Sequence, residues 1–164
     1  LNLFLLVPMI AVAGWLTWHF LSRLGETIRI GTTSLEVSDL PLYPGQRYDI
    51  CLVQAGRMSL NWLKLMLACD ESATFREGTD VRTERRRVFL QKVLQCEPVD
   101  VRPGTPFVHQ GELVTSEEIM HSFQASSNSI QWKLLVQGQL QQGSQFECVF
   151  PVVVYPNPSV KERD

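Results

Sequence analysis

The residues of this chain best suited to metal or redox chemistry are its four cysteines. Cys51, Cys69, Cys96 and Cys148 are separated by 18, 27 and 52 positions, and none of these spacings is the C-x-x-C of a zinc site or a redox pair. Three of them fall on apolar faces of predicted strands, where a free cysteine acts as a small hydrophobic residue. The pattern favours buried thiols. Disulfides are the alternative if the domain faces outside the cell, and no metal or other cofactor is predicted.

Two histidines, His109 and His121, lie in the charged part of the chain. His121 precedes Ser122, but no serine has the G-x-S-x-G surroundings that place a nucleophile on a strained turn. We therefore expect no catalytic residues and no enzyme. A hydrolase that uses His121 or His109 with an acidic partner is the enzymatic alternative.

The neighbouring carboxylates Asp70-Glu71 and Glu117-Glu118 are a second candidate for acid–base chemistry. Adjacent side chains on a strand point to opposite faces, so neither pair forms a shared acid–base site there. The glycines Gly104 and Gly111 are isolated and form no phosphate-binding loop.

One basic cluster stands out, formed by Arg82, Arg85, Arg86 and Arg87. Three acidic residues lie within the same segment, 76–87, which leaves it with two excess positive charges. A solvated hairpin face with local ion pairs explains this composition. The sharper interpretation is contact with anionic lipid headgroups, each arginine contributing on the order of 1 kcal/mol near a membrane surface. These four arginines are therefore the predicted lipid-contact residues.

The first part of the chain has the composition of a membrane element. Leu1 to Phe20 contains no Asp, Glu, Lys or Arg, and Trp15 and Trp18 lie shortly before Arg23. A helix over Leu1–Leu24 would extend for roughly 36 Å, enough to cross a hydrocarbon core of about 30 Å. We predict a transmembrane helix here. A secretory signal peptide is the alternative, because Ala11-Val12-Ala13 has the small-x-small form of a cleavage site.

The positive-inside bias gives an expected orientation for this helix. Arg23, Arg29 and Arg47 follow the apolar segment, and no Lys or Arg precedes it in the sequence. Positively charged flanks are retained on the cytoplasmic side. We therefore expect a globular domain in the cytoplasm.

From Ile28 onward the sequence alternates between apolar and polar residues, as short antiparallel strands do. The clearest strands are Tyr48–Val53, Phe107–Val114 and Ile130–Val136. Others are expected at Ser34–Ser38, Leu63–Cys69, Phe75, Arg87–Leu94 and Phe146–Val154, with a loop at Gly78-Thr79-Asp80. Roughly seven to nine short strands predict an all-β fold, an antiparallel two-sheet sandwich of arrestin-like or immunoglobulin-like type. The expected core residues are Leu65, Leu67, Trp132, Leu134, Phe146, Phe150 and Val152.

These segments divide the chain into four parts. We expect a transmembrane helix at 1–24, a linker at 25–34, the β-sandwich domain at 35–156 and a flexible tail at 157–164. The tail is polar, with one proline and four charges.

Several motifs resemble those of a known family. Ser122-Phe123 precedes the run Ile130-x-Trp132-x-Leu134-x-Val136, and Leu42-Tyr43-Pro44-Gly45 precedes an earlier strand. This order resembles the arrestin N-terminal sandwich, where a Ser-Phe pair precedes a strand of the form Ile-x-Tyr-x-Leu/Val. Members of that family usually place a proline just before the Ser-Phe, whereas Ile119-Met120-His121 stands here. The resemblance implies a non-enzymatic domain that binds peptides, membrane-protein tails or another copy.

The layout of a helix followed by a β domain also resembles the end of a bacterial membrane protein family of unknown function. Members have two helices and a variable C-terminal extension, and Leu1–Leu24 would be the second helix. The net charge of −2 gives no electrostatic reason to expect nucleic acid. We therefore predict a membrane-anchored, non-catalytic domain for protein interaction or assembly, with a sheet edge that accepts an extended peptide. A disulfide-bonded extracytoplasmic envelope domain is a further alternative.

Overall fold

The computed structural model describes residues 8–21, 31–78 and 80–157. Within these ranges the chain forms nine β-strands in two antiparallel sheets. One sheet contains β1 (Thr33–Val37), β2 (Arg47–Gln54) and β6 (Phe107–Val114), in the order β1-β2-β6. The second sheet contains β3 (Met58–Glu77), β4 (Asp80–Cys96), β5 (Val99–Val101), β7 (Phe123–Gln124), β8 (Asn128–Leu140) and β9 (Gln145–Val152). Its order is β4-β3-β8-β7, with β5 on β3 and β9 on β8.

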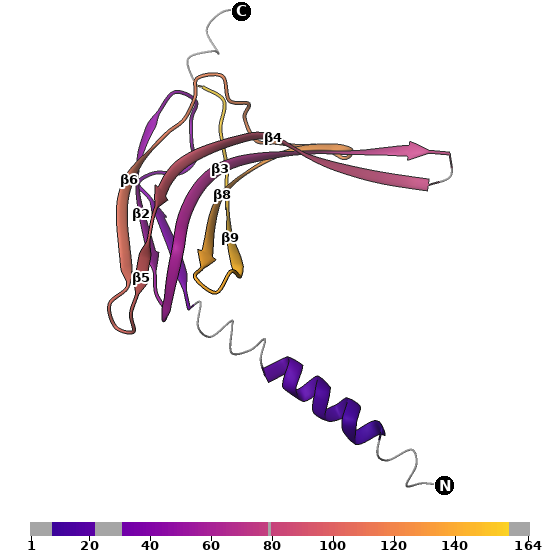
Figure 1. The fold of residues 1–164 in the computed structure, drawn as a ribbon. Helices are drawn as coiled ribbons and strands as arrows, with labels where there is room; N and C mark the ends of the chain where they lie inside the picture. The colour runs from indigo at the N-terminus through magenta and orange to yellow at the C-terminus, as the bar shows by residue number, and fades with distance from the viewer. Residues whose placement is uncertain (1–7, 22–30, 79, 158–164) are drawn as a thin grey trace, which may run out of the picture.

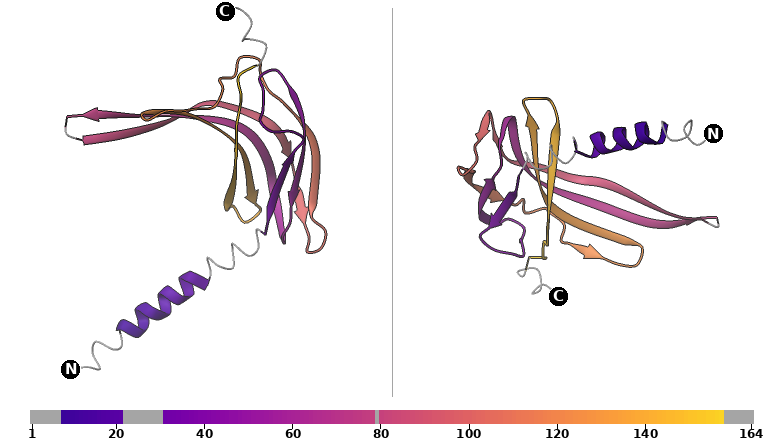
Figure 2. Two further views of the ribbon diagram at one scale, coloured as in Figure 1. Left: turned by 180° about the vertical axis from the view of Figure 1, so that it is seen from behind. Right: turned by 90° about the horizontal axis from the view of Figure 1, so that it is seen from below.

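The two sheets pack face to face, and the alternating apolar residues of the strands meet between them. Leu63, Leu65 and Leu67 of β3 are fully buried against Ile50 and Leu52 of β2 in one core. Of the core residues expected from the sequence, five are buried, and Phe146 and Phe150 are partly buried and pack against the same core. The antiparallel two-sheet sandwich is therefore confirmed. Figures 1 and 2 show the two layers from three directions.

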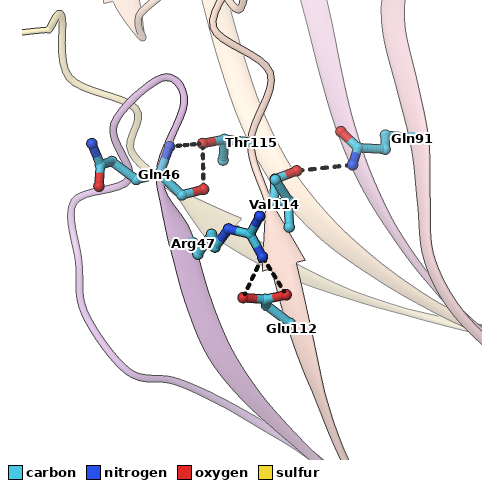
Figure 3. A network of polar contacts seen from close by, with 6 residues as sticks. All are labelled: Gln46, Arg47, Gln91, Glu112, Val114 and Thr115. Atoms are coloured by element: carbon cyan, nitrogen blue, oxygen red, sulfur yellow. Dashed lines mark hydrogen bonds and ion pairs between the residues drawn. The ribbon is translucent and has the colours of Figure 1, made fainter.

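One side of the sandwich is closed by contacts between β4 and β6 (Figure 3). The Gln91 amide on β4 donates a 2.9 Å hydrogen bond to the carbonyl of Val114. The Thr115 hydroxyl accepts a hydrogen bond from the Gln46 backbone N–H at 3.0 Å and donates to the Tyr43 carbonyl at 2.7 Å. These bonds attach the end of β6 to the loop before β2 and to the edge of the larger sheet.

The expected strands Phe75 and Arg87–Leu94 are parts of one long hairpin instead. β3 runs for 20 residues and β4 for 17, with the turn at Gly78. The sequence between Met58 and Glu77 contains no glycine or proline, so nothing in it ends the strand. Gly78 has a φ of +67°, a conformation that other residues rarely adopt.

The helix at the start of the chain differs from the expected transmembrane helix. It covers residues 8–21, which at about 1.5 Å per residue extend for roughly 21 Å. No helix among the described residues is both long enough and apolar enough to cross a membrane. Residues 1–7 and 22–24 of the predicted span lie outside the described residues, as do parts of the predicted linker and tail.

Candidate functional site

The β3–β4 hairpin projects from the sandwich as a ribbon and is its most exposed element (Figures 1 and 2). β3 pairs with β8 as far as Ala73, opposite Asn128. Beyond that point the strand pairing of Thr74–Glu77 continues with β4, opposite Asp80–Thr83, and the last link toward β8 is a 2.6 Å hydrogen bond from the Thr74 N–H to the Ser127 carbonyl. Four further pairs at about 3.3 Å per residue carry the ribbon roughly 13 Å past the end of β8.

The register of the ribbon divides the four predicted lipid-contact arginines between its two faces. Arg85 and Arg87 lie opposite Ser72 and Asp70, whereas Arg82 and Arg86 lie opposite Phe75 and Glu71. Because side chains alternate along a strand, each pair of arginines shares one face.

We call one side of the ribbon the cationic face. It carries Arg76, Arg85, Arg87 and the neighbouring Lys133 of β8, with the carboxylate Asp70. Two hydroxyl pairs confirm that these positions share a side. Thr74 and Thr83 are joined at 2.9 Å, and Ser72 and Ser129 at 2.7 Å. We call the opposite side the mixed face, where Arg82 and Arg86 lie with Glu71 and Glu84. Its Arg82–Glu84 ion pair has an N–O distance of 3.7 Å.

A three-membered ion cluster holds the base of the cationic face together. Asp70 is 7% exposed, and its two carboxylate oxygens accept hydrogen bonds from Arg87 Nε at 3.0 Å and Lys133 Nζ at 2.5 Å. Burial on its own would raise the pKa of Asp70, but the bonds and charges of Lys133 and Arg87 outweigh it and lower that pKa below 3.8. Asp70 therefore stays ionised at neutral pH. The cluster keeps one excess positive charge.

The cationic face opens at its base into a hollow of about 570 Å³ at the seam between β7 and β9. Arg85, Lys133 and Gln131 line it together with Phe123, Val149 and Val153. The three apolar side chains are 47%, 49% and 48% exposed. The hollow thus combines cationic side chains with apolar side chains that are open to solvent.

Sequence reasoning missed Asp70 and Lys133 as members of this site. Asp70 lies 63 positions from Lys133, and only the pairing of β3 with β8 brings them together. A weak signal was present, because the apolar run of β3 ends at Cys69 and Asp70 follows it directly. A register shift between Cys69 and Asp70 marks this point in the structure.

The two histidines of the enzymatic alternative, His109 and His121, lie in separate parts of the structure. His109 of β6 stacks on Phe107, and its Nδ1 lies 3.6 Å from the Sγ of Cys96. Burial raises the pKa of Cys96, which keeps this sulfur a thiol and a poor nucleophile at neutral pH. His121 is exposed and lines a separate hollow with Glu117 and Met120.

All four cysteines are free in the structure, and Cys69 is fully buried. Cys51, Cys96 and Cys148 are only partly buried. Within residues 8–21, 31–78 and 80–157, no three His, Cys, Asp or Glu side chains are grouped so that they could hold a metal ion.

We predict that Cys69 is the slowest thiol of the native protein. Burial, followed by the charges of Asp70 and Glu71, raises its pKa from 9.0 to about 11. That shift alone lowers the thiolate fraction at pH 8 about a hundredfold. Iodoacetamide labelling read by mass spectrometry should therefore modify Cys51 long before Cys69. In denaturant without reductant all four should label; two unlabelled cysteines would support the disulfide alternative.

The strand order also identifies the free sheet edges. Among the described strands, β1 and β6 end the smaller sheet, and β4, β7 and β9 lie at the edges of the larger one. The thiol of Cys148 on β9 donates to the Thr33 hydroxyl on β1 at 3.4 Å, so the edges of β1 and β9 lie side by side. The predicted addition of a peptide strand to a sheet edge stays a prediction.

The fold is an arrestin-like β-sandwich. The solved structure of Spo0M, a sporulation control protein from Bacillus subtilis, is similar to this chain, with a TM-score of 0.58 and 8% sequence identity. The similarity covers 77% of this chain and 50% of Spo0M, so the chain spans about half the length of that protein. No protein-family model and no curated protein matches the sequence. The likeness shows the fold alone.

Proposed function

We propose that this chain is a membrane-anchored, non-catalytic module that binds a protein partner at the membrane surface. The observation that carries the proposal is the β3–β4 ribbon. The first nine residues of β4, from Asp80 to Val88, are all exposed. A strand so exposed adds little to the core, and its free backbone edge and side chains are available to a partner.

The distal end of the ribbon presents apolar and cationic side chains together. Phe75 is 42% exposed opposite Arg82, and Val81 is 65% exposed opposite Arg76. An exposed aromatic beside arginine is a common composition at the centre of protein interfaces. This supports a protein partner at the distal end of the ribbon.

The proposed membrane anchor is supported by the surface of the N-terminal helix. Every residue from 8 to 21 is exposed, and Trp15 and Trp18 are 65% and 75% exposed. A helix that is apolar all round requires a cover, which a bilayer supplies. Residues 1–24 would hold the sandwich next to the membrane, and Arg23, Arg29 and Arg47 favour the cytoplasmic side.

A shortened ribbon tests the proposal. Ala73 and Glu84 are paired in the register of β3 and β4, so Asn-Gly can replace residues 74–83 and close the hairpin with a two-residue turn. We expect the free energy of unfolding to change by less than about 1 kcal/mol, because no described residue of this segment belongs to the core. Co-purification of the partner with the full chain from membranes should be lost.

A photocrosslinking amino acid localises the contact in the full chain. Placed at Val81 it should give one discrete adduct in the membrane fraction, and placed at Val108, which is also exposed on β6, it should give none. The chain should be recovered with the membranes throughout. A chain found in the soluble fraction, or equal adducts from both positions, would contradict the proposal.

A further inference from the structure

We infer that the hollow at the base of the cationic face binds the headgroup of an anionic phospholipid. The inference rests on the proposed function in one respect: the nearby membrane supplies the lipid. It is separate from the protein contact, which was placed at the distal end of the ribbon.

The charge of the hollow indicates an anionic ligand. Arg85 and Lys133 line it from β4 and β8. The carboxylate of Asp70, which also lines it, accepts hydrogen bonds from both Arg87 and Lys133, so its charge is already compensated. The Arg85 side chain is exposed and has no hydrogen bond or ion pair with any described residue, so its guanidinium is available to bind a phosphate oxygen.

The apolar lining residues indicate that the ligand also has a hydrocarbon part. Phe123, Val149 and Val153 are each about half exposed and line the same hollow as Arg85 and Lys133. A free phosphate ion would leave these side chains in water, whereas the first methylenes of an acyl chain would cover them. The hollow of about 570 Å³ has the size of an ordinary small-molecule site.

The mixed face of the same ribbon lacks this combination. Arg82 and Arg86 lie there with Glu71 and Glu84, so the two arginines share this face with two carboxylates, and Arg82 forms an ion pair with Glu84. Arg85 and Arg86 are therefore adjacent in sequence but differ in their surroundings. This difference provides a matched pair of variants, Arg85→Gln and Arg86→Gln.

The test uses the full chain in an uncharged detergent. Native mass spectrometry with phosphatidylglycerol and phosphatidylcholine of the same acyl chains measures retained lipid. We expect preferential retention of phosphatidylglycerol, about fivefold weaker retention in Arg85→Gln, and no change in Arg86→Gln. Phe123→Ser should also weaken retention of phosphatidylglycerol.

Three results would overturn the inference. Equal losses in both arginine variants would show diffuse attraction to the whole ribbon, and no loss in Arg85→Gln would exclude the hollow. Displacement of phosphatidylglycerol by an equal concentration of inorganic phosphate would assign the site to a free anion. The shortened ribbon keeps Arg85 and Lys133, so loss of the protein partner in that variant and loss of lipid here are independent results.

Discussion

Replacing Trp132 with alanine is expected to lower the free energy of unfolding by about 3–5 kcal/mol. Trp132 is 3% exposed at the centre of β8, and its ring packs against Phe89 with a centroid distance of 5.2 Å. Its Nε1 donates a 2.9 Å hydrogen bond to the Met120 carbonyl. The substitution removes the largest apolar side chain of this part of the core and leaves a cavity.

Thermal unfolding followed by circular dichroism measures this effect. A loss of this size should lower the Tm by roughly 10–20 °C, or unfold the domain outright, since domains are stable by only about 5–15 kcal/mol. An unchanged Tm would show that the inward face of β8 has been assigned wrongly.

Two variants separate packing from hydrogen bonding. Trp132→Phe keeps an aromatic ring beside Phe89 but leaves the Met120 carbonyl without its donor, so we expect a smaller loss of about 1–2 kcal/mol. Trp62→Ala is the matched control for tryptophan removal. Trp62 lies on β3 of the same sheet but is only partly buried, and Lys64 Nζ lies 4.3 Å from the centre of its ring. Trp62→Ala should lower the free energy of unfolding by clearly less than Trp132→Ala does.

The sandwich could be predicted because each strand carries its own inside–outside pattern. Ile130, Trp132, Leu134 and Val136 alternate with polar residues whatever their partners are, and period-two alternation is a local property of a strand. The same pattern identified Leu65, Leu67 and Val152 as core residues, and all three are buried.

The ribbon and its hollow could not be predicted in the same way. Past Cys69, no apolar alternation marks where the strand runs, because neither face of the ribbon is buried in a core. Alternation alone separates Arg85 from Arg86, but the neighbours of each arginine follow from pairing with β3 and from the register shift at Asp70, which depend on residues distant in the sequence. Composition alone therefore showed a basic cluster with a small net charge, where the structure has one cationic face and one neutralised face.

The N-terminal helix is the element whose extent differs from the sequence-based expectation. Its apolar composition predicted a span over Leu1–Leu24, and the structure describes a helix only over residues 8–21.

Replacing Asp70 with asparagine is the second substitution with a large expected effect. The asparagine side chain has nearly the same shape but no charge, and it would leave Lys133 and Arg87 without their counter-ion. We expect the free energy of unfolding to fall by about 1–3 kcal/mol at pH 7. The lower end of this range is expected because the Arg87 side chain is 40% exposed and partly screened by solvent. Urea unfolding at several pH values measures it.

The pH dependence identifies the charge as the cause. The folded pKa of Asp70 is lowered, so its contribution is fully present above its ordinary pKa of 3.8 and is lost as the pH falls through the lower, folded pKa. The difference in free energy of unfolding between the wild-type protein and Asp70→Asn should therefore be constant near neutral pH and shrink below about pH 4. A difference that stays the same at pH 3 would show that shape or packing, not the charge, is responsible.

The same variant should act on the hollow in the opposite direction. Removing the Asp70 carboxylate releases Lys133 and Arg87 from their ion pairs and raises the positive charge beside Arg85 by one unit. Retention of phosphatidylglycerol should then increase while the free energy of unfolding decreases. General damage to the fold would lower both quantities together, so opposite signs in one protein would show that Asp70 stabilises the base of the ribbon and also limits its affinity for anions.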